Sequence, residues 1–329
     1  MLQVVQKDQP ILDVRELTLH IVTARGELRA VQDVSFQARN GEVVAIVGES
    51  GAGKSVTAMS LMRLMPSPPA RFAGGTIELN GRDLLKLSRS EMREVRGNEI
   101  SMIFQEPMTA LNPALRIWRQ IAEPLVRHRN MNWSQARRRA VELLGEVQIP
   151  DPEARSTAYP HQFSGGMRQR VMIAVAIACN ARLIVADEPT TALDVTVQAQ
   201  ILDLLTRIMR ASNGALVLIT HDLGVVARYA DFVNVMYAGR IVECAPADEL
   251  YRAPRHPYTR GLMASIPRIA GPLAHRLEAI AGQPPSLLED ILGCAFSPRC
   301  SRSTPKCQVE RPPLEAFSPR HRYACWNPE

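Results

Sequence analysis

The stretch GESGAGKS at residues 48–55 decides the fold, and it follows directly on the apolar run EVVAIVG at residues 42–48. It matches the pattern G-x-x-x-x-G-K-[ST] at every fixed position and opens a helical pattern, SVTAMSLMRLM. Its glycines allow successive backbone N–H groups to point at one phosphate. Lys54 is expected to reach the β- and γ-phosphates, and the Ser55 hydroxyl to bind Mg²⁺. The stretch predicts a nucleoside triphosphate site between a strand and a helix.

Two acidic residues, Asp187 and Glu188, end a second apolar run, RLIVADEP at residues 182–189. A carboxylate at a strand tip can hold Mg²⁺ through water, and we expect Asp187 opposite Ser55. Glu188 can polarise the attacking water as a general base. His221 ends the run ALVLITH and is predicted to contact the γ-phosphate, although a lone histidine is more often structural.

The arrangement of apolar residues indicates an α/β fold. Alternating segments between about residues 11 and 46 predict antiparallel strands, and Asn80-Gly81 indicates a hairpin. Continuous apolar runs are typical of parallel strands covered on both faces, and four occur here: EVVAIVG, EISMIFQ, RLIVADEP and ALVLITH. Helical patterns alternate with these runs, as in VTVQAQILDLLTRIMRAS, which is the order of an α/β domain.

Strand patterns stop between Asn112 and His161, where IWRQIAEPLVRHR and WSQARRRAVELLGEVQI predict helices. We assign an inserted helical subdomain to about residues 108–180 and expect Ser134 to cap its second helix. The arginines at 137–139 are expected on its solvated side. After about residue 253 prolines become frequent and regular patterns fade. A nucleotide-binding domain is therefore predicted at residues 1–265, and a small C-terminal module at residues 266–329.

Composition is that of an ordinary globular protein, with 46% hydrophobic and 22% charged residues in a chain of 329. The net charge of +6 is scattered along the chain and favours binding to neither nucleic acid nor an acidic membrane surface. No apolar run is long enough to cross a bilayer. We expect no nucleic-acid partner, and membrane contact only through partner proteins.

Six motifs resemble those of an ATP-binding cassette (ABC) ATPase, in that family's order, over roughly residues 11–265. They are GESGAGKS, MIFQEP, FSGGMRQR, LIVADEP, TALDV and ITHD, similar to the Walker A, Q-loop, signature, Walker B, D-loop and switch-histidine motifs. The resemblance implies a RecA-like core with an antiparallel β subdomain and an inserted helical subdomain. It implies catalysis by Glu188, His221 and Gln105, and magnesium binding by Ser55, Gln105 and Asp187. ATP would be bound by Gly48, Ser50, Gly51, Ala52, Gly53, Lys54, Ser55 and Val56.

The signature stretch QFSGGMRQR at residues 162–170 places Ser-Gly-Gly at the head of a helical pattern, which suits an anion. In the ABC family this motif faces the ATP held by the other subunit. The resemblance implies that hydrolysis requires a dimer, in which the residues acting on the partner's ATP are Ser164, Gly165, Gly166 and Asp194. Ile21 stands where many cassettes carry the aromatic residue that stacks on adenine, which leaves the adenine contact unassigned.

A narrower resemblance, carried by QEPMTALNP, SGGMRQRVMIAVAIA and APRHPYTRGL, is to the ATPases of oligopeptide/dipeptide importers. It implies a second, different ATPase subunit, two transmembrane permeases and an extracytoplasmic solute-binding protein. The chain would lie peripherally on the cytoplasmic face of a bacterial inner membrane and drive import of dipeptides or oligopeptides. Nickel chelates, glutathione and opines are alternative solutes, and a soluble ABC ATPase outside transport is an alternative function.

Six cysteines fall into two groups. Cys179 and Cys244 stand alone in structural segments and are expected to be buried and inert. The other four lie in a segment too short for its own core, spaced C-x5-C-x6-C-x17-C, which suggests a metal staple: Cys294, Cys300, Cys307 and Cys325. Zinc sites usually have closer pairs, and the wide gaps fit an iron–sulfur cluster at least as well. The resemblance to peptide-importer ATPases implies a [4Fe–4S] cluster, with Zn²⁺ or no metal as the alternatives.

Overall fold

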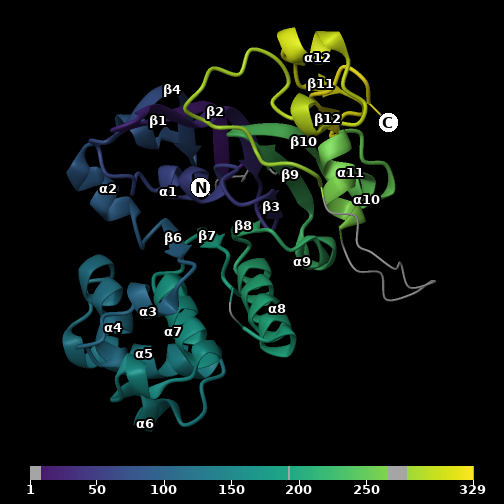
Figure 1. The fold of residues 1–329 in the computed structure, drawn as a ribbon. Helices are drawn as coiled ribbons and strands as arrows, with labels where there is room; N and C mark the ends of the chain where they lie inside the picture. The colour runs from purple at the N-terminus through teal and green to yellow at the C-terminus, as the bar shows by residue number, and fades with distance from the viewer. Residues whose placement is uncertain (1–8, 192, 266–279, 329) are drawn as a thin grey trace. The chain divides into compact units, whose positions relative to one another are not determined.

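A computed structural model describes residues 9–191, 193–265 and 280–328 of the chain (Figure 1). It divides into two compact units. The first comprises Met1–Ile11, Ala38–Glu42 and Lys86–Leu218, and the second Leu12–Gln37, Val43–Leu85 and Ile219–Glu329. The predicted division at residue 265 stays a prediction, and residues 266–279 of the predicted module lie outside the described residues.

The first unit contains neighbouring strands in the order β6–β7–β8. Strand β6 (Ile100–Ile103) pairs in parallel with β7 (Leu183–Asp187), and β8 (Ala215–Thr220) follows next to β7. Every residue of β7 and β8 is buried. This is the arrangement that their unbroken apolar runs predict, because a parallel strand is covered on both faces.

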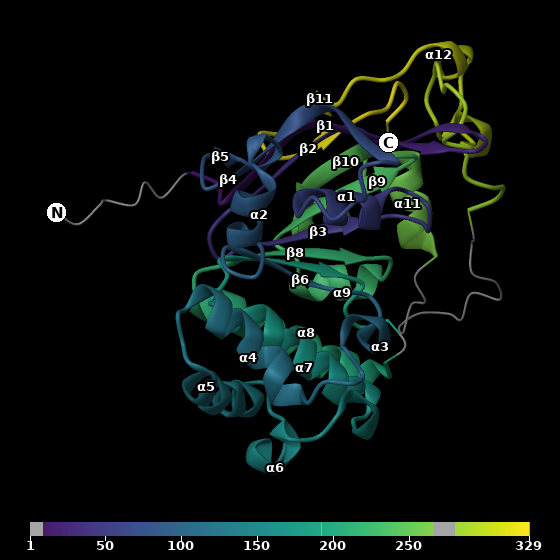
Figure 2. The ribbon, with the colours of Figure 1, turned by 90° about the vertical axis from the view of Figure 1, so that its left-hand side faces the viewer.

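Helices make up the rest of the first unit, and α4, α5 and α7 pack against one another (Figure 2). Their buried faces carry Ile121 and Leu125 from α4 and Leu143 from α5. The helices are α2 (Arg89–Val95), α3 (Pro107–Ala110), α4 (Ile117–His128), α5 (Trp133–Glu146), α6 (Pro152–Ser156), α7 (Gly165–Ile177) and α8 (Val195–Ala211). The predicted helical insertion is thus present.

The cap of α5 is Asn132, and the prediction of Ser134 was wrong. Asn132 Oδ1 accepts a hydrogen bond from the Gln135 backbone N–H at 2.9 Å, and Gln135 Oε1 accepts one from the Asn132 N–H at 3.0 Å. This reciprocal pair satisfies two backbone donors at the start of the helix. Ser134 consequently lies inside the first turn.

The second unit contains an antiparallel sheet in the order β2–β1–β4–β5. Its strands are β1 (Leu12–Thr23), β2 (Gly26–Ala38), β4 (Ala70–Leu79) and β5 (Arg82–Asp83). The β4–β5 hairpin pairs Leu79 with Arg82 across Asn80 and Gly81, whose φ angles are 50° and 78°. Two consecutive positive φ values are what a tight two-residue hairpin requires, so the Asn-Gly prediction is confirmed.

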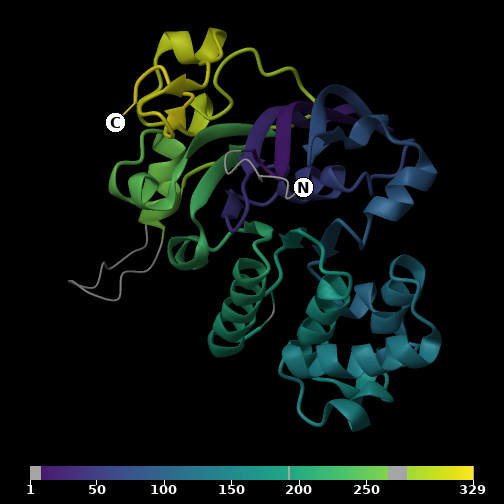
Figure 3. The same ribbon diagram turned by 180° about the vertical axis from the view of Figure 1, so that it is seen from behind.

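A second group of strands in this unit begins with β3 (Val43–Val47), which pairs in parallel with β9 (Phe232–Tyr237). Strand β10 (Arg240–Pro246) pairs antiparallel with β9. The C-terminal segment then adds β12 (Arg322–Tyr323) to β10 and β11 (Glu315–Ala316) to β12. The C-terminal segment therefore continues the β9–β10 sheet, and it lies beside that sheet in Figures 1 and 3.

The helices of the second unit are α1 (Lys54–Leu61), α9 (Leu223–Tyr229), α10 (Ala247–Arg252), α11 (Pro257–Ala264) and α12 (Pro305–Val309). Helix α11 lies beyond residue 253, in a stretch where the sequence shows no regular helix or strand pattern. Its Tyr258 packs with Tyr237 of β9 and Phe296 of the C-terminal segment, with ring centroids 4.5–5.4 Å apart. Among the described residues, no helix is long and apolar enough to span a bilayer.

Candidate functional site

The loop Gly48–Gly53 connects β3 to α1 and has the close backbone contacts of a phosphate-binding loop. A Cβ on Gly48 would lie 2.1 Å from the Met236 carbonyl oxygen, and one on Gly53 would lie 2.5 Å from the Ala30 carbonyl oxygen. Both positions therefore exclude any side chain. Gly53 also has a φ of 101° and directly precedes the first residue of α1. The loop thus presents backbone N–H groups at a helix N-terminus, which is the arrangement that binds phosphate.

Lys54 lies across this loop, with its side chain almost wholly buried. Its Nζ donates hydrogen bonds to the carbonyl oxygens of Gly48 at 2.8 Å and Glu49 at 3.0 Å. The ammonium group is therefore held over the loop, where the phosphate oxygens of a nucleotide would lie. Ser55 follows at the second position of α1.

Two residues from elsewhere in the second unit hold the phosphate loop, and the sequence patterns identified neither. The Tyr258 hydroxyl accepts a hydrogen bond from the Glu49 backbone N–H at 2.8 Å. The Arg299 guanidinium binds both carboxylate oxygens of Glu49, at 2.6 and 3.0 Å, and donates to the Tyr237 hydroxyl at 3.3 Å. The Arg299 side chain is 4% exposed. The C-terminal module is consequently bonded directly to the phosphate loop.

Asp187 and Glu188 end β7 in the first unit and have different surroundings. Asp187 is buried, at 6% exposure, whereas Glu188 is half-buried and has a φ of 45°. This φ lies in the left-handed region, which an L-residue adopts at some cost and which recurs at functional sites. It turns the Glu188 side chain toward Gln105 Nε2 and Thr191 Oγ1, which both donate to Glu188 Oε2 at 3.0 Å.

The first unit therefore joins the predicted Q-loop glutamine to the predicted general base. Thr191 was not among the predicted site residues, although its position three residues after Glu188 in the same turn was a possible signal. Two donors on one oxygen, Oε2, hold the Glu188 carboxylate in a defined orientation.

The signature residues form the start of α7. Ser164 is the N-cap of that helix, and its side chain accepts a hydrogen bond from the Met167 backbone N–H at 3.3 Å. A Cβ on Gly166 would lie 2.8 Å from Val197 Cγ1 of α8, so Gly166 also allows close helix packing. Asp194 caps α8 by accepting from the Val197 N–H at 3.0 Å.

The remaining predicted residues lie where the strands end. His221 is exposed directly after β8, and Ile21 is half-buried near the end of β1. Ser55 belongs to the second unit and Asp187 to the first. Their predicted opposition across a magnesium ion, like the assignment of the other site residues, stays a prediction.

Comparison with known proteins places this geometry in a family. A family model described as "ABC transporter" matches residues 31–191, and one described as "Oligopeptide/dipeptide transporter, C-terminal region" matches residues 242–307. The oligopeptide transport ATP-binding protein OppD of Bacillus subtilis is 49% identical over 316 residues, which cover 96% of this chain and 88% of that protein. The chain belongs to the ATP-binding subunits of oligopeptide/dipeptide ABC transporters.

Further relatives of this peptide-transporter ATPase support the same assignment. The dipeptide transport ATP-binding protein DppD of Bacillus subtilis is 48% identical, covering 97% of this chain and 95% of that protein. Among solved structures, the cassette MJ0796, titled a dimeric post-hydrolysis state bound to ADP and Pi, has a TM-score of 0.65 at 26% identity. The matched region covers 72% of this chain and 98% of the MJ0796 chain. The ABC ATPase α/β fold is thereby confirmed, and ABC ATP-binding subunits of this family are ATPases.

The cysteines of this ABC ATPase are all free thiols. Cys179 and Cys244 are buried, as predicted, and burial raises the pKa of both thiols, that of Cys244 to about 11. Within residues 9–191, 193–265 and 280–328, no group of three or more His, Cys, Asp or Glu side chains is arranged to hold a metal ion. The predicted [4Fe–4S] cluster and its zinc alternative are therefore not shown by this structure.

The four late cysteines nevertheless share one environment. Burial, together with the smaller effect of the nearby Cys294, Cys300 and Cys307, raises the pKa of Cys325 to about 11. The Cys325 sulfur accepts a hydrogen bond from the Asn327 N–H at 3.4 Å. The thiols are thus gathered in one small region without forming a closed ligand set.

Proposed function

We propose that this chain hydrolyses ATP to drive the import of dipeptides or oligopeptides through partner permeases. Likeness over nearly the whole chain to OppD and DppD supports this function, because those proteins are named for oligopeptide and dipeptide transport. The observation that carries it within the site is the Gln105–Glu188 hydrogen bond, which couples the expected general base to the segment leading into the helical subdomain. The nickel-chelate, glutathione and opine alternatives have no comparable support here.

In this proposal the phosphate loop binds ATP and Lys54 neutralises its β- and γ-phosphates. Magnesium would be held by Ser55, Gln105 and Asp187, and it would supply charge neutralisation between the phosphates. Glu188 accepts the proton of the attacking water, while Gln105 and Thr191 keep its carboxylate oriented. His221 would contact the γ-phosphate from the end of β8.

The proposed active form is a dimer with a second, different ATPase subunit. Ser164, Gly165 and Gly166 at the head of α7, together with Asp194, would face the ATP bound to that partner's Walker A loop. The N-terminus of α7 favours an anion through its free backbone N–H groups. We place this dimer on the cytoplasmic face of the inner membrane, beneath two permeases that receive solute from an extracytoplasmic binding protein.

We also propose that the C-terminal cysteines hold a [4Fe–4S] cluster, with Zn²⁺ as the alternative. The support is chemical: four thiols in one small module influence one another's ionisation, and backbone donors reach at least one sulfur. Their arrangement here is not a ligand set, so metal binding would have to draw the sulfurs together. A structural role is favoured, because ATP hydrolysis requires no electron.

Transport by reconstituted complexes tests the proposed function. The chain, its partner ATPase and the permeases are placed in proteoliposomes with the binding protein, and uptake of a labelled tripeptide is followed with ATP inside. Uptake that requires ATP and is lost with Glu188→Gln supports the proposal. ATP hydrolysis that responds to the binding protein loaded with a nickel chelate or glutathione, and not with peptide, would reassign the solute.

A further inference from the structure

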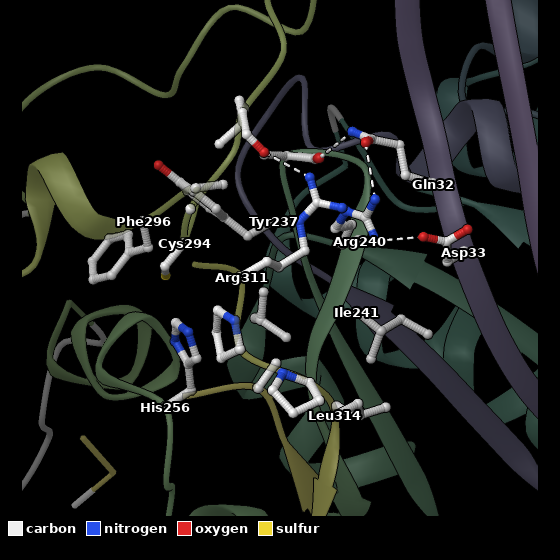
Figure 4. Close-up of a pocket in the computed structure, with 18 of the residues that line it drawn as sticks. Gln32, Asp33, Tyr237, Arg240, Ile241, His256, Cys294, Phe296, Arg311 and Leu314 are labelled. Carbon is white, nitrogen blue, oxygen red and sulfur yellow. Dashed lines mark hydrogen bonds and ion pairs between the residues drawn. The ribbon is translucent and has the colours of Figure 1, made fainter. Parts of the chain in front are cut away.

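A cavity of about 380 Å³ lies in the second unit between β2, β10 and the C-terminal segment (Figure 4). Strand β10 contributes its first residues, Arg240, Ile241 and Val242, and none of the phosphate loop residues line the cavity. Its volume falls within the range of small-molecule sites. The catalytic residues proposed above are not among its lining residues, and of the four C-terminal cysteines only Cys294 is.

Two arginines extend into this cavity side by side, and only one has a carboxylate partner (Figure 4). Arg240 binds Asp33 Oδ2 at 2.7 Å and Gln32 Oε1 at 3.1 Å. Arg311 donates to the Ile291 carbonyl oxygen at 2.6 Å, and no described carboxylate lies within ion-pair distance of it. Burial and the positive charge of Arg240 lower the pKa of Arg311, and the negative charges of Asp33 and Asp290 offset part of this lowering. An anion between them would relieve both effects.

His256 supplies a hydrogen-bond donor at another wall of the cavity. Its Nδ1 accepts a hydrogen bond from the Tyr258 backbone N–H at 3.1 Å, which places the ring proton on Nε2. Nε2 is buried and has no partner in the described structure, and the residue is 1% exposed. A buried donor without a partner is costly, and native structures rarely keep one. An acceptor on a bound molecule would satisfy it.

The rest of the lining and the charge balance define the ligand further. Apolar walls come from Ile241, Phe296 and Leu314. The charged side chains of the lining are three arginines and two carboxylates, which leaves one excess positive charge: Arg240, Arg311 and Arg322 against Glu16 and Asp33. One excess charge matches a monoanion better than a phosphate dianion. It also disfavours a free peptide, whose ammonium group would cancel its carboxylate.

We propose that this cavity binds a small monocarboxylate with an apolar body and a second hydrogen-bond acceptor. Its carboxylate lies between Arg311 and Arg240, its acceptor faces His256 Nε2, and its apolar part packs on Ile241 and Leu314. The site is separate from the ATP site and from the transported solute, so it goes beyond the proposed function.

Calorimetric titration of the full chain with N-acetyl-L-leucine tests the proposal. This probe carries a carboxylate, an amide carbonyl and an apolar side chain. We expect saturable binding of one molecule per chain, and about 10-fold or greater weakening for the neutral N-acetyl-L-leucinamide, since the charge-assisted hydrogen bonds are lost. Arg311→Gln is expected to weaken binding similarly, and Leu314→Trp to block it by filling the cavity. Leu314 is only half-buried, so that variant keeps the test valid if Arg311→Gln fails to fold.

Arg252→Gln is the matched control, because Arg252 is exposed on α10 and does not line the cavity. It is expected to bind the probe like the natural chain. The absence of saturable binding up to about 10 mM probe would overturn the proposal, since such affinity is too weak for a specific site. Equal binding of the amide, equal binding of inorganic phosphate, or unchanged binding in both cavity variants would overturn it as well.

Discussion

Arg299 binds Glu49 through two hydrogen bonds, from Nη1 to Oε2 at 2.6 Å and from Nη2 to Oε1 at 3.0 Å, although 250 residues separate them in sequence. Glu49 is the second residue of the phosphate loop, and Arg299 immediately precedes Cys300 of the C-terminal module. This paired geometry fixes direction as well as distance, which a single charge contact would not. The phosphate loop is therefore bonded to the C-terminal module, and we expect its conformation to depend on this contact.

Replacing Arg299 should weaken nucleotide binding. In the Arg299→Gln variant Glu49 loses its charged partner, and the loop loses an anchor that contributes about 1.5–3 kcal/mol by analogy with other charged hydrogen bonds. We expect the Kd for ATP of the isolated chain to rise by about 10-fold in this variant. The Kd of Arg299→Lys should lie between that of the natural chain and that of Arg299→Gln, because lysine keeps the charge but cannot bind both carboxylate oxygens in the same way. Fluorescence titration with a labelled nucleotide measures this. Arg252→Gln should leave the Kd unchanged, and an unchanged Kd in Arg299→Gln would show that the contact does not position the loop.

The Glu188 environment predicts a graded loss of turnover. Glu188→Gln preserves shape but removes the base, so ATPase activity should fall by about 10²-fold or more while ATP affinity is kept. Thr191→Val removes one of the two donors on Glu188 Oε2 and should lower turnover by about 10-fold with little change in KM. Thr190→Val is the control, since the threonine hydroxyl that donates to Glu188 Oε2 is that of Thr191. Steady-state hydrolysis by the assembled complex decides the matter; near-normal turnover of Glu188→Gln would exclude it as the base.

If the signature motif acts on the partner's ATP, a change in that motif should affect hydrolysis by the assembled transporter but not ATP binding by this chain. Gly166→Asp should leave ATP binding by the isolated chain intact and abolish hydrolysis by the assembled transporter, because a carboxylate there repels the partner's γ-phosphate. A new side chain at Gly166 would also press on Val197. Placing Gly166→Asp in a Val197→Ala background relieves that contact, and activity should stay absent. Recovery of hydrolysis in the double variant would mean that only packing had been disturbed.

Metal analysis of protein purified without oxygen tests the cysteine module. A [4Fe–4S] cluster would give about four irons per chain and broad absorbance near ~400 nm. Cys294→Ser should bleach it, whereas Cys179→Ser should not, because Cys179 is buried in the first unit and the four C-terminal cysteines belong to the second. A result of one zinc and no iron per chain would contradict the cluster and support the zinc alternative. A folded chain without any metal would contradict both.

Acidification should loosen the C-terminal strand. The Glu243 carboxylate is fully buried and lies 2.7 Å from His321 Nε2, next to β12. Burial raises the pKa of Glu243, but the hydrogen bonds to His321 and from the backbone N–H groups of Arg255 and His256 outweigh it, so the pKa lies below its ordinary 4.5. A lowered pKa stabilises the folded state above the unfolded pKa. That contribution is lost as pH falls below about 4.5 through the folded value.

Hydrogen exchange of β12 at pH 7 and at about pH 3.5 measures this effect. Protection should decrease at the lower pH, and Glu243→Gln should reduce local stability by about 2 kcal/mol at pH 7 while removing most of the decrease. Glu310→Gln is the control, because Glu310 is exposed and its carboxylate lies 3.7 Å from Lys306 Nζ, one turn earlier in the chain. A pH response in Glu243→Gln equal to that of the natural chain would show that another group is responsible.

Several features could be predicted from the sequence because their causes are local. The phosphate loop depends on glycines whose backbone conformations no other residue adopts, and the Asn80-Gly81 hairpin on two consecutive positive φ angles. Buried parallel strands appear as unbroken apolar runs because both of their faces are covered. The cap of α5 shows the limit of such signals: Asn132 and Ser134 are both capping residues, and only the backbone geometry chose between them.

The amino-acid sequence by itself determined the ABC class, the nucleotide site and the family, because each resides in contiguous motifs. Only the tertiary structure decided which distant side chains hold those motifs. Gln105 on Glu188, Tyr258 and Arg299 on Glu49, and His256 in the cavity depend on strands and helices meeting after folding. Spacing along the chain carries no information about such contacts, since a side chain 250 residues away is brought near only by the packing of the β9–β10 sheet, α11 and the C-terminal segment.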